Sequence, residues 1–127
     1  MKFEILFYED SRGNSPVWDY LKDLETRMAG DKSARIELNQ IMLNLELLER
    51  LGTKNNAKFT KKIEDDLWEL RPGNNRILYF YNDGVKFVLL HIFRKKTKQT
   101  PEREKQKARN QIADFIANGG YKHENMD

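Results

Sequence analysis

Residues 63–96 constrain the fold most, because three runs of strand-forming residues alternate there with two turn signals. The first turn signal is Pro72-Gly73-Asn74-Asn75, and the second is Asn82-Asp83-Gly84. Residues 67–71, 76–82 and 85–95 are therefore predicted to form a three-stranded antiparallel meander. The rest of the chain is expected either to cover this sheet or to lead into it.

The turns also predict which residues pair across the strands. A four-residue loop in the first turn pairs Arg71 with Arg76, and a two-residue loop in the second pairs Arg76 with His91. These three side chains would then form one row on one face of the sheet. Because two adjacent arginines repel each other, the row indicates a bound anion.

The N-terminal half predicts one strand and two helices. Apolar residues alternate over residues 2–8, which is typical of a strand. Ser15 and Pro16 begin a helix that ends near Gly30, and Asp31 caps a longer helix that ends at Gly52. The longer helix has a wide apolar surface, expected to pack against both the first helix and the sheet: Ile36, Ile41, Leu43, Leu45, Leu47, Leu48 and Leu51.

The C-terminal part predicts a last helix over residues 101–118, with Thr100 as its N-cap. Its expected packing face comprises Ala108, Ile112, Phe115 and Ile116. Residues 53–62 are predicted to be a loop and residues 121–127 a tail. The whole pattern predicts an α+β fold in a single domain of residues 1–127. An N-terminal strand and a helical hairpin pack on the antiparallel meander, which a C-terminal helix follows.

Composition narrows the function classes. The chain has no cysteine, which excludes disulfides and thiolate metal sites. Neither a signal peptide nor an apolar run of about 18 residues is present, so a cytoplasmic location is expected. Residues 1–52 carry 7 Lys/Arg and 10 Asp/Glu, whereas residues 53–127 carry 16 and 10. The basic half favours a nucleic-acid partner; the alternative is that these residues only solubilise the surface.

Four acidic residues near the first strand of the meander resemble a metal cluster: Glu64, Asp65, Asp66 and Glu69. They lie beside a dense set of lysines, and no histidine is close in sequence. We interpret them as charge balance at the sheet edge and predict no metal site.

Several motifs follow in order along nearly the whole chain: Ser15-Pro16-Val17, Leu67-Trp-Glu-Leu-Arg71-Pro72, Arg76-Ile-Leu-Tyr79, Leu90-His-Ile-Phe93-Arg-Lys95-Lys96 and Thr100-Pro101. Their order and spacing resemble the RelE/ParE toxin superfamily, with the phage-derived, HigB-like branch as the nearest group. The resemblance implies a RelE-like fold and the toxin of a type II toxin–antitoxin system.

The resemblance further implies a ribosome-dependent mRNA endonuclease that needs neither metal nor cofactor. A gyrase-directed toxin and a non-catalytic module that only binds an antitoxin are the alternatives. The implied partners are the ribosome, mRNA and a cognate HigA-like helix-turn-helix antitoxin, in a heterotetramer or larger complex, with no membrane.

Metal-free RNA cleavage needs a base, an acid and cations that stabilise the phosphorane. Arg71 and Arg76 are the predicted cations, because guanidinium binds phosphate in a bidentate manner. His91 and Lys95 are the predicted proton-transfer groups, although a histidine in this apolar run is also typical of a core position. Lys62 and Lys96 compete for the same role.

The remaining basic residues are predicted to bind RNA: Lys61, Lys62, Arg94, Lys96, Lys98, Arg103 and Lys107. On the last helix, Lys105 and Arg109 extend this set into a face that could follow a phosphate backbone. Tyr79 and Tyr81 could stack on bases, but strand tyrosines are more often packed in the sheet.

Overall fold

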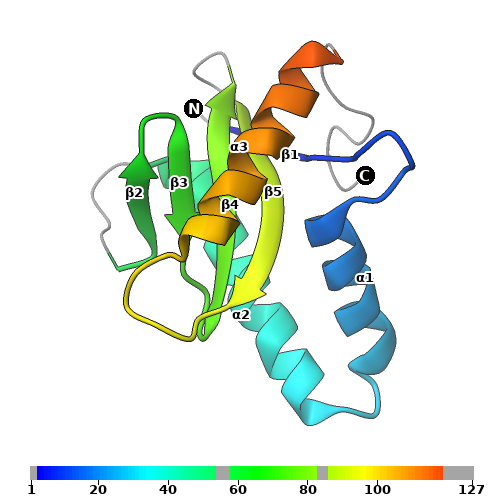
Figure 1. Ribbon diagram of the computed structural model, residues 1–127. Helices are drawn as coiled ribbons and strands as arrows, with labels where there is room; N and C mark the ends of the chain where they lie inside the picture. The colour runs from blue at the N-terminus through cyan, green and yellow to red at the C-terminus, as the bar shows by residue number, and fades with distance from the viewer. Residues whose placement is uncertain (1–2, 54–57, 83–85, 119–127) are drawn as a thin grey trace.

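In the computed structural model, the described residues 3–53, 58–82 and 86–118 form three helices and a five-stranded sheet (Figure 1). The predicted α+β architecture is confirmed. The elements are β1 (Glu4–Phe7), α1 (Pro16–Arg27), α2 (Lys32–Leu51), β2 (Thr60–Glu64), β3 (Leu67–Leu70), β4 (Asn75–Asn82), β5 (Lys86–Arg94) and α3 (Glu102–Ala117). None of these helices combines the length and the apolarity that crossing a bilayer requires.

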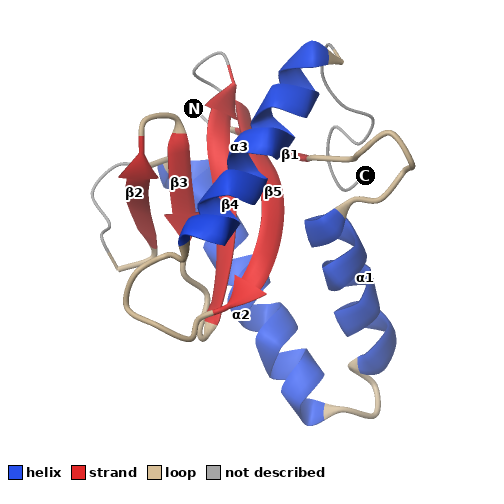
Figure 2. Cartoon of the chain, in the orientation of Figure 1, coloured by secondary structure: helices blue, strands red, loops and turns tan. Residues whose placement is uncertain are grey.

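The sheet has the strand order β1-β5-β4-β3-β2. β1 runs parallel to β5, and the other neighbours are antiparallel. The α1–α2 hairpin covers one face of the sheet and α3 covers the other (Figures 1 and 2). Both faces of the central strands are therefore buried, which explains why β4 and β5 read as continuous apolar runs.

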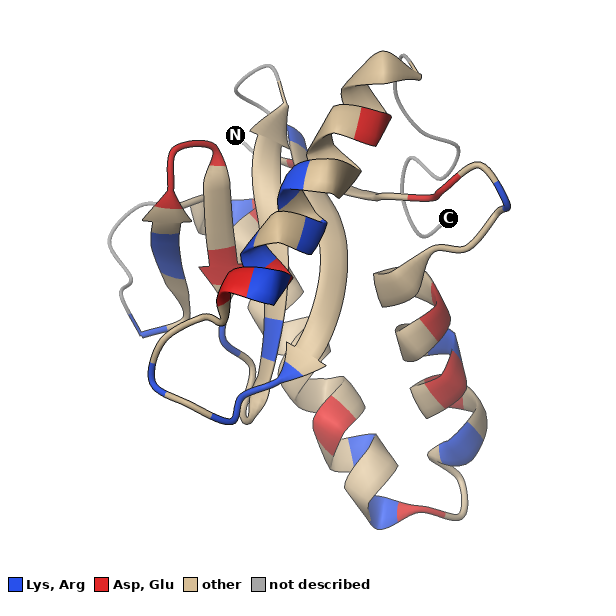
Figure 3. Ribbon diagram, viewed as in Figure 1, with Lys and Arg blue, Asp and Glu red and all other residues tan. Residues whose placement is uncertain are grey.

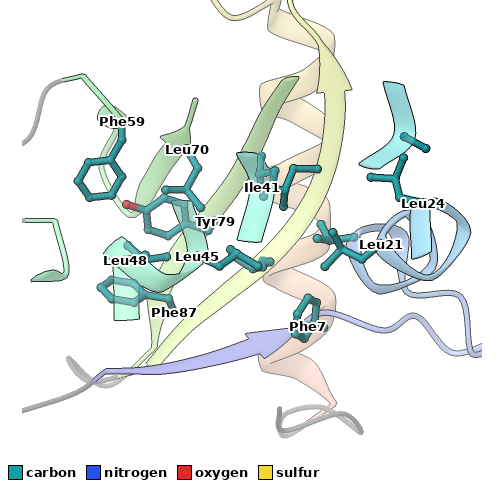
Figure 4. Packing of buried hydrophobic residues seen from close by; sticks show 14 residues of the cluster. Phe7, Leu21, Leu24, Ile41, Leu45, Leu48, Phe59, Leu70, Tyr79 and Phe87 are labelled. Carbon is teal, nitrogen blue, oxygen red and sulfur yellow. The ribbon is translucent and has the colours of Figure 1, made fainter. Parts of the chain in front are cut away.

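The larger core lies between the sheet and the α1–α2 hairpin (Figure 4). It includes Leu21 and Leu24 of α1, together with Phe7, Tyr79 and Phe87 of the sheet. From α2 only a narrow strip is buried, namely Ala34, Ile41, Leu45 and Leu48. The prediction of a wide packing surface is wrong for three positions, since the helix meets the rest of the fold on one side and leaves exposed Ile36, Leu43 and Leu51.

The smaller core lies between the sheet and α3. Ala108 and Phe115 are buried there as predicted, but Ile116 is exposed because it lies one position further around the helix. The N-cap of α3 is Pro101, not Thr100 as predicted. The Thr100 hydroxyl donates instead to Glu69 Oε2 at 2.7 Å, which ties the approach to α3 to strand β3.

The first hairpin has the predicted register. Glu69 pairs with Leu78 and Leu70 with Ile77, and continuing this register by one residue sets Arg71 opposite Arg76. Pro72 O accepts a hydrogen bond from Asn75 N at 3.0 Å and closes the turn.

The predicted register of the second hairpin is wrong. Arg76 pairs with Phe93, while His91 pairs with Leu78. Two shifts of one residue cause the difference. Asn82 pairs with Lys86, one residue further along than a two-residue loop allows. A β-bulge adds the second shift, because Tyr79 pairs with Leu89, Leu78 pairs with His91, and Leu90 is left as an extra residue. The turn residues Asp83, Gly84 and Val85 lie outside the described residues, as do Lys54 and the predicted tail at 121–127.

Strand β2 lies where part of a loop was predicted. It pairs with β3 at the sheet edge, and Lys61 and Lys62 are exposed on it. Thr60 anchors the strand, because its hydroxyl lies 2.6 Å from that of Tyr79 and its Oγ1 donates to Glu69 O at 3.1 Å. Tyr79 is fully buried by this contact and the core, so it has no face to offer an RNA base.

Candidate active site

Arg71 and Arg76 lie side by side where β3 ends and β4 begins, on the face that α3 covers. Between them, Glu69 Oε1 is 3.6 Å from Arg71 Nε and 3.8 Å from Arg76 Nε. The side chain of Arg71 is 27% exposed, that of Arg76 10% and that of Glu69 5%. One buried carboxylate thus faces two cations and leaves an excess positive charge at this end of the sheet.

The Arg76 guanidinium is held by the turn that precedes it. Its Nη1 donates to Gly73 O at 2.9 Å and to Asn75 O at 2.7 Å. Burial lowers the pKa of Arg76, Glu69 raises it and the Arg71 charge lowers it again. Since guanidinium is not deprotonated in proteins, Arg76 remains a partly desolvated cation. A desolvated, fixed cation of this kind is suited to an anionic ligand.

A shallow pocket adjoins Arg76 and Glu69 and is bounded by residues 95–101, the loop before α3. Lys95, Lys96 and Lys98 of this loop are exposed and line the pocket, so its rim is strongly basic. Figure 3 shows several Lys or Arg positions along the loop before α3. Lys95 N donates to Asn74 O at 2.8 Å, which fixes the start of the loop against the first turn. The fold thus brings together Arg71, Arg76 and Lys95 from three separate segments of sequence.

His91 is not among the residues that line this pocket. It is only 1% exposed, and α3 occupies both of its ring nitrogens, with Gln111 Oε1 2.8 Å from Nδ1 and Glu104 Oε1 2.9 Å from Nε2. Burial lowers the pKa of His91, and the hydrogen bonds to Gln111 and Glu104 act in the opposite direction. We assign His91 a structural role in joining β5 to α3.

Comparison with known proteins identifies the family. Residues 20–113 match the family described as phage derived protein Gp49-like (DUF891). The chain belongs to the Gp49-like family. This is a family of RelE-like toxins, so the predicted membership of the RelE/ParE superfamily is confirmed. The matched stretch extends from α1 into α3 and contains the whole pocket.

No curated protein sequence is significantly similar to this Gp49-like chain. Among solved structures, it is similar to a chain of the YoeB-YefM complex from Staphylococcus aureus, with a TM-score of 0.47 and 15% identity, over 76% of this chain and 100% of that one.

The structure divides the predicted RNA-binding residues of the Gp49-like chain between several surfaces. Lys61 pairs with Glu69 across β2 and β3, so it is on the face of the two arginines. Lys62 is on the opposite face, 3.7 Å from Asp65. Arg94 also lies on the opposite face, since it pairs with Asn75, whose side chain contacts α2.

Two predicted residues of α3, Arg103 and Lys107, line a second and wider groove, which Tyr8, Asp10 and Pro16 bound on the other side. Arg109 does not belong to a solvated basic face, because it is paired with Glu64 at 2.7 and 2.8 Å and with Glu102 at 2.9 Å. The interpretation of Glu64 as a charge-balancing residue is confirmed by this pair.

Sequence reasoning missed Glu69 and Thr100 as parts of the site. Glu69 was grouped with its acidic neighbours, although its spacing of two residues from Arg71 sets both on one face of a strand. Thr100 was interpreted only as a helix cap. Its contact with Glu69 arises because the loop folds back over the sheet, and the local sequence does not indicate this. Across the described residues, no three His, Asp or Glu side chains are grouped so as to hold a metal ion.

Proposed function

We propose that this Gp49-like toxin is a HigB-like, ribosome-dependent endoribonuclease that cuts mRNA without a metal and so inhibits translation. The observation that carries the proposal is the pair Arg71 and Arg76 beside a pocket rimmed by lysines. The two charges repel each other, Glu69 offsets part of this repulsion, and an RNA phosphate would relieve the rest.

The reaction uses the 2′-hydroxyl of the RNA as nucleophile. A base removes the hydroxyl proton, the O2′–P bond forms, the P–O5′ bond breaks, and an acid protonates the leaving O5′. The products are a 2′,3′-cyclic phosphate and a 5′-hydroxyl. Arg71 and Arg76 are assigned to the phosphorane oxygens, where added charge is concentrated in the transition state. Lys95 is assigned to protonate O5′, because it is a charged donor at the pocket rim.

The surrounding basic residues are assigned to the RNA strand. Lys61, Lys96 and Lys98 lie on the same side of the sheet as the arginine pair, or on the loop beside it. Arg103 and Lys107 lie along α3 and are assigned to ribosomal RNA, because an exposed helix face can follow a phosphate backbone without chemistry. Arg94 and Lys62 lie on the opposite face and are assigned only to docking on ribosomal RNA.

The proposed partner in the resting state is an antitoxin of the HigA-like, helix-turn-helix type, in a heterotetramer or larger complex. A cationic site of this kind must be blocked, or kept from the ribosome, while the toxin is inactive. The α1–α2 side of the molecule carries the acidic half of the chain and is the proposed docking side. Hydrogen-exchange protection on α1 and α2 in the complex is expected, and protection confined to the basic face would contradict this docking side.

Primer extension on a translated reporter mRNA tests the proposed function. Purified toxin should produce cuts at codon positions when ribosomes are present and none when they are absent. Arg71→Ala should lower the cleavage rate by about tenfold or more, because an oxyanion contact is worth at least that factor. Cuts that do not require ribosomes, or undiminished cutting by Arg71→Ala, would contradict the proposal. Intact mRNA together with trapped DNA–gyrase complexes would favour the gyrase alternative.

A further inference from the structure

A polar cluster lies behind the arginine pair, on the opposite face of the sheet. Glu37 of α2 accepts hydrogen bonds on Oε2 from the Tyr20 hydroxyl of α1 and from Asn75 Nδ2, the latter at 2.7 Å. Asn75 is buried and begins β4. None of these three residues takes part in the proposed cleavage, yet Asn75 directly precedes Arg76.

We propose that Glu37 is a positioning residue for Arg76 and acts through Asn75. The inference rests on the proposed function, which assigns Arg76 to the phosphate. Consecutive side chains of a strand point to opposite faces, so the Asn75 amide reaches α2 while Arg76 faces the pocket. The carbonyl between them, Asn75 O, accepts from Arg76 Nη1 at 2.7 Å. Fixing the Asn75 side chain from behind therefore fixes an acceptor that orients the guanidinium in front.

The same helix supports the second acceptor. Gly73 O also binds Arg76 Nη1, and Gly73 is covered by Gln40 of α2, whose Oε1 would be only 2.5 Å from a Cβ at that glycine. Glu37 and Gln40 are three residues apart and so lie on one side of α2. One turn of this helix thus lies against both residues whose carbonyls hold the guanidinium.

This arrangement predicts an effect on turnover more than on binding. A guanidinium that is already oriented needs no reorganisation when charge develops on the phosphate. Without the support, Arg76 still attracts the RNA, but it samples other rotamers. Glu37→Ala and Asn75→Ala are each expected to lower kcat about tenfold and to change KM by less than about twofold. Glu46→Ala, on an exposed site of the same helix, is the matched control and should leave both unchanged.

A double-mutant cycle separates positioning from general destabilisation. If Glu37 acts through Asn75, the double variant is no slower than Asn75→Ala alone. If the pair acts through Arg76, then Glu37→Ala causes no further loss in an Arg76→Ala background. Additive losses, or the same loss in the Arg76→Ala background, would overturn the proposal. Thermal melts confirm that each assay is run on folded protein.

A second readout does not depend on activity. The Arg76 Nε–H signal in ¹⁵N NMR spectra is identified by its disappearance in Arg76→Ala, and its exchange with solvent reports how firmly the guanidinium is held. Exchange should become several-fold faster in Glu37→Ala and stay unchanged in Glu46→Ala. Unchanged exchange in Glu37→Ala overturns the positioning role. If the wild-type protein fails to cut mRNA, the proposed function falls, and the NMR measurement still decides whether Glu37 positions Arg76.

Discussion

At the scale of single residues, the site depends on how Arg76 is fixed rather than on its charge alone. Two backbone carbonyls hold Nη1, and Glu69 approaches Nε, so the planar guanidinium has one orientation. Lysine has the same charge but a single terminal nitrogen, and it cannot reproduce a fork with several fixed donors.

Arg76→Lys is therefore expected to behave almost like Arg76→Ala, with mRNA cleavage reduced about tenfold or more in single-turnover assays. Arg27→Ala is the control, because Arg27 is an exposed residue at the end of α1 that pairs with Asp23 and Asp31. If Arg76→Lys keeps most of the activity, charge alone is sufficient and the fork is not used.

Tyr20 predicts a pH dependence of stability. Burial and the hydrogen bond to Glu37 raise the pKa of Tyr20 from 10.0 to about 12. The folded state therefore favours the neutral phenol, and this contribution is complete below pH 10 and is lost as the pH rises from about 10 to 12.

Tyr20→Phe should be less stable than the wild type by about 1 kcal/mol at pH 8, because it removes the hydrogen bond to Glu37. The difference should shrink in urea unfolding experiments as the pH increases beyond 10. A difference that stays constant up to pH 12 would show that the Tyr20 phenol does not titrate differently in the folded and unfolded states.

At the scale of elements, the local signals explain which parts of the fold and site were predictable. Pro72 and Gly73 specify a turn in which only one register is compatible with the strands on either side, so the pairing of Arg71 with Arg76 could be predicted. The bulge at Leu90 could not be predicted, because no residue in this apolar run marks the position of the extra residue.

Two other elements show the same limit. Strand β2 is polar because it is an edge strand, and the sequence Thr60–Glu64 has few apolar residues to mark it. A two-residue turn and a regular strand would place His91 opposite Arg76, whereas the longer turn and the bulge together set it opposite Leu78, where it contacts α3. Site residues near the tight turn were therefore predictable, while those beyond the irregularity depended on tertiary packing.

The turn at Gly73 provides a test at this scale. Gly73 has φ of 60°, and a Cβ there would lie 2.5 Å from Gln40 Oε1. Gly73→Ala should lower the free energy of unfolding by about 1–2 kcal/mol, since the left-handed backbone opposes a Cβ and the end of the Gln40 side chain must move aside.

Gly30→Ala is the matched control, because a Cβ at Gly30 meets nothing within 4 Å. It should change the free energy of unfolding by less than about 0.5 kcal/mol in the same urea titration. Equal stability of the two variants would mean that the turn relaxes without cost.

At the scale of the whole molecule, charge is distributed unevenly. Basic residues line the loop before α3, while α1 carries several acidic residues on the other side of the sheet (Figure 3). A polyanion is therefore attracted to one side of the toxin, and its affinity should fall steeply with salt.

Binding to purified ribosomes, measured from about 50 to 200 mM salt, tests this asymmetry. Lys96→Gln should reduce the slope of log K against log salt by about 0.7–1, the value for one lost phosphate contact. Lys32→Gln, at the start of α2, removes the same charge from the other side and should leave the slope unchanged. Equal reductions would indicate that only net charge matters.

The pairing of β1 with β5 has a consequence for the time at which this toxin becomes active. Glu4 pairs with Lys86, and between them lie both helices of the hairpin and three strands. Contacts this distant in sequence form late, because the intervening chain must first be ordered. During synthesis, β1 has no partner until β5 has emerged, and the loop that carries Lys95 emerges later still. The nascent chain therefore cannot assemble the complete site until synthesis has passed that loop, so the arginine pair exists for an interval without Lys95 beside it.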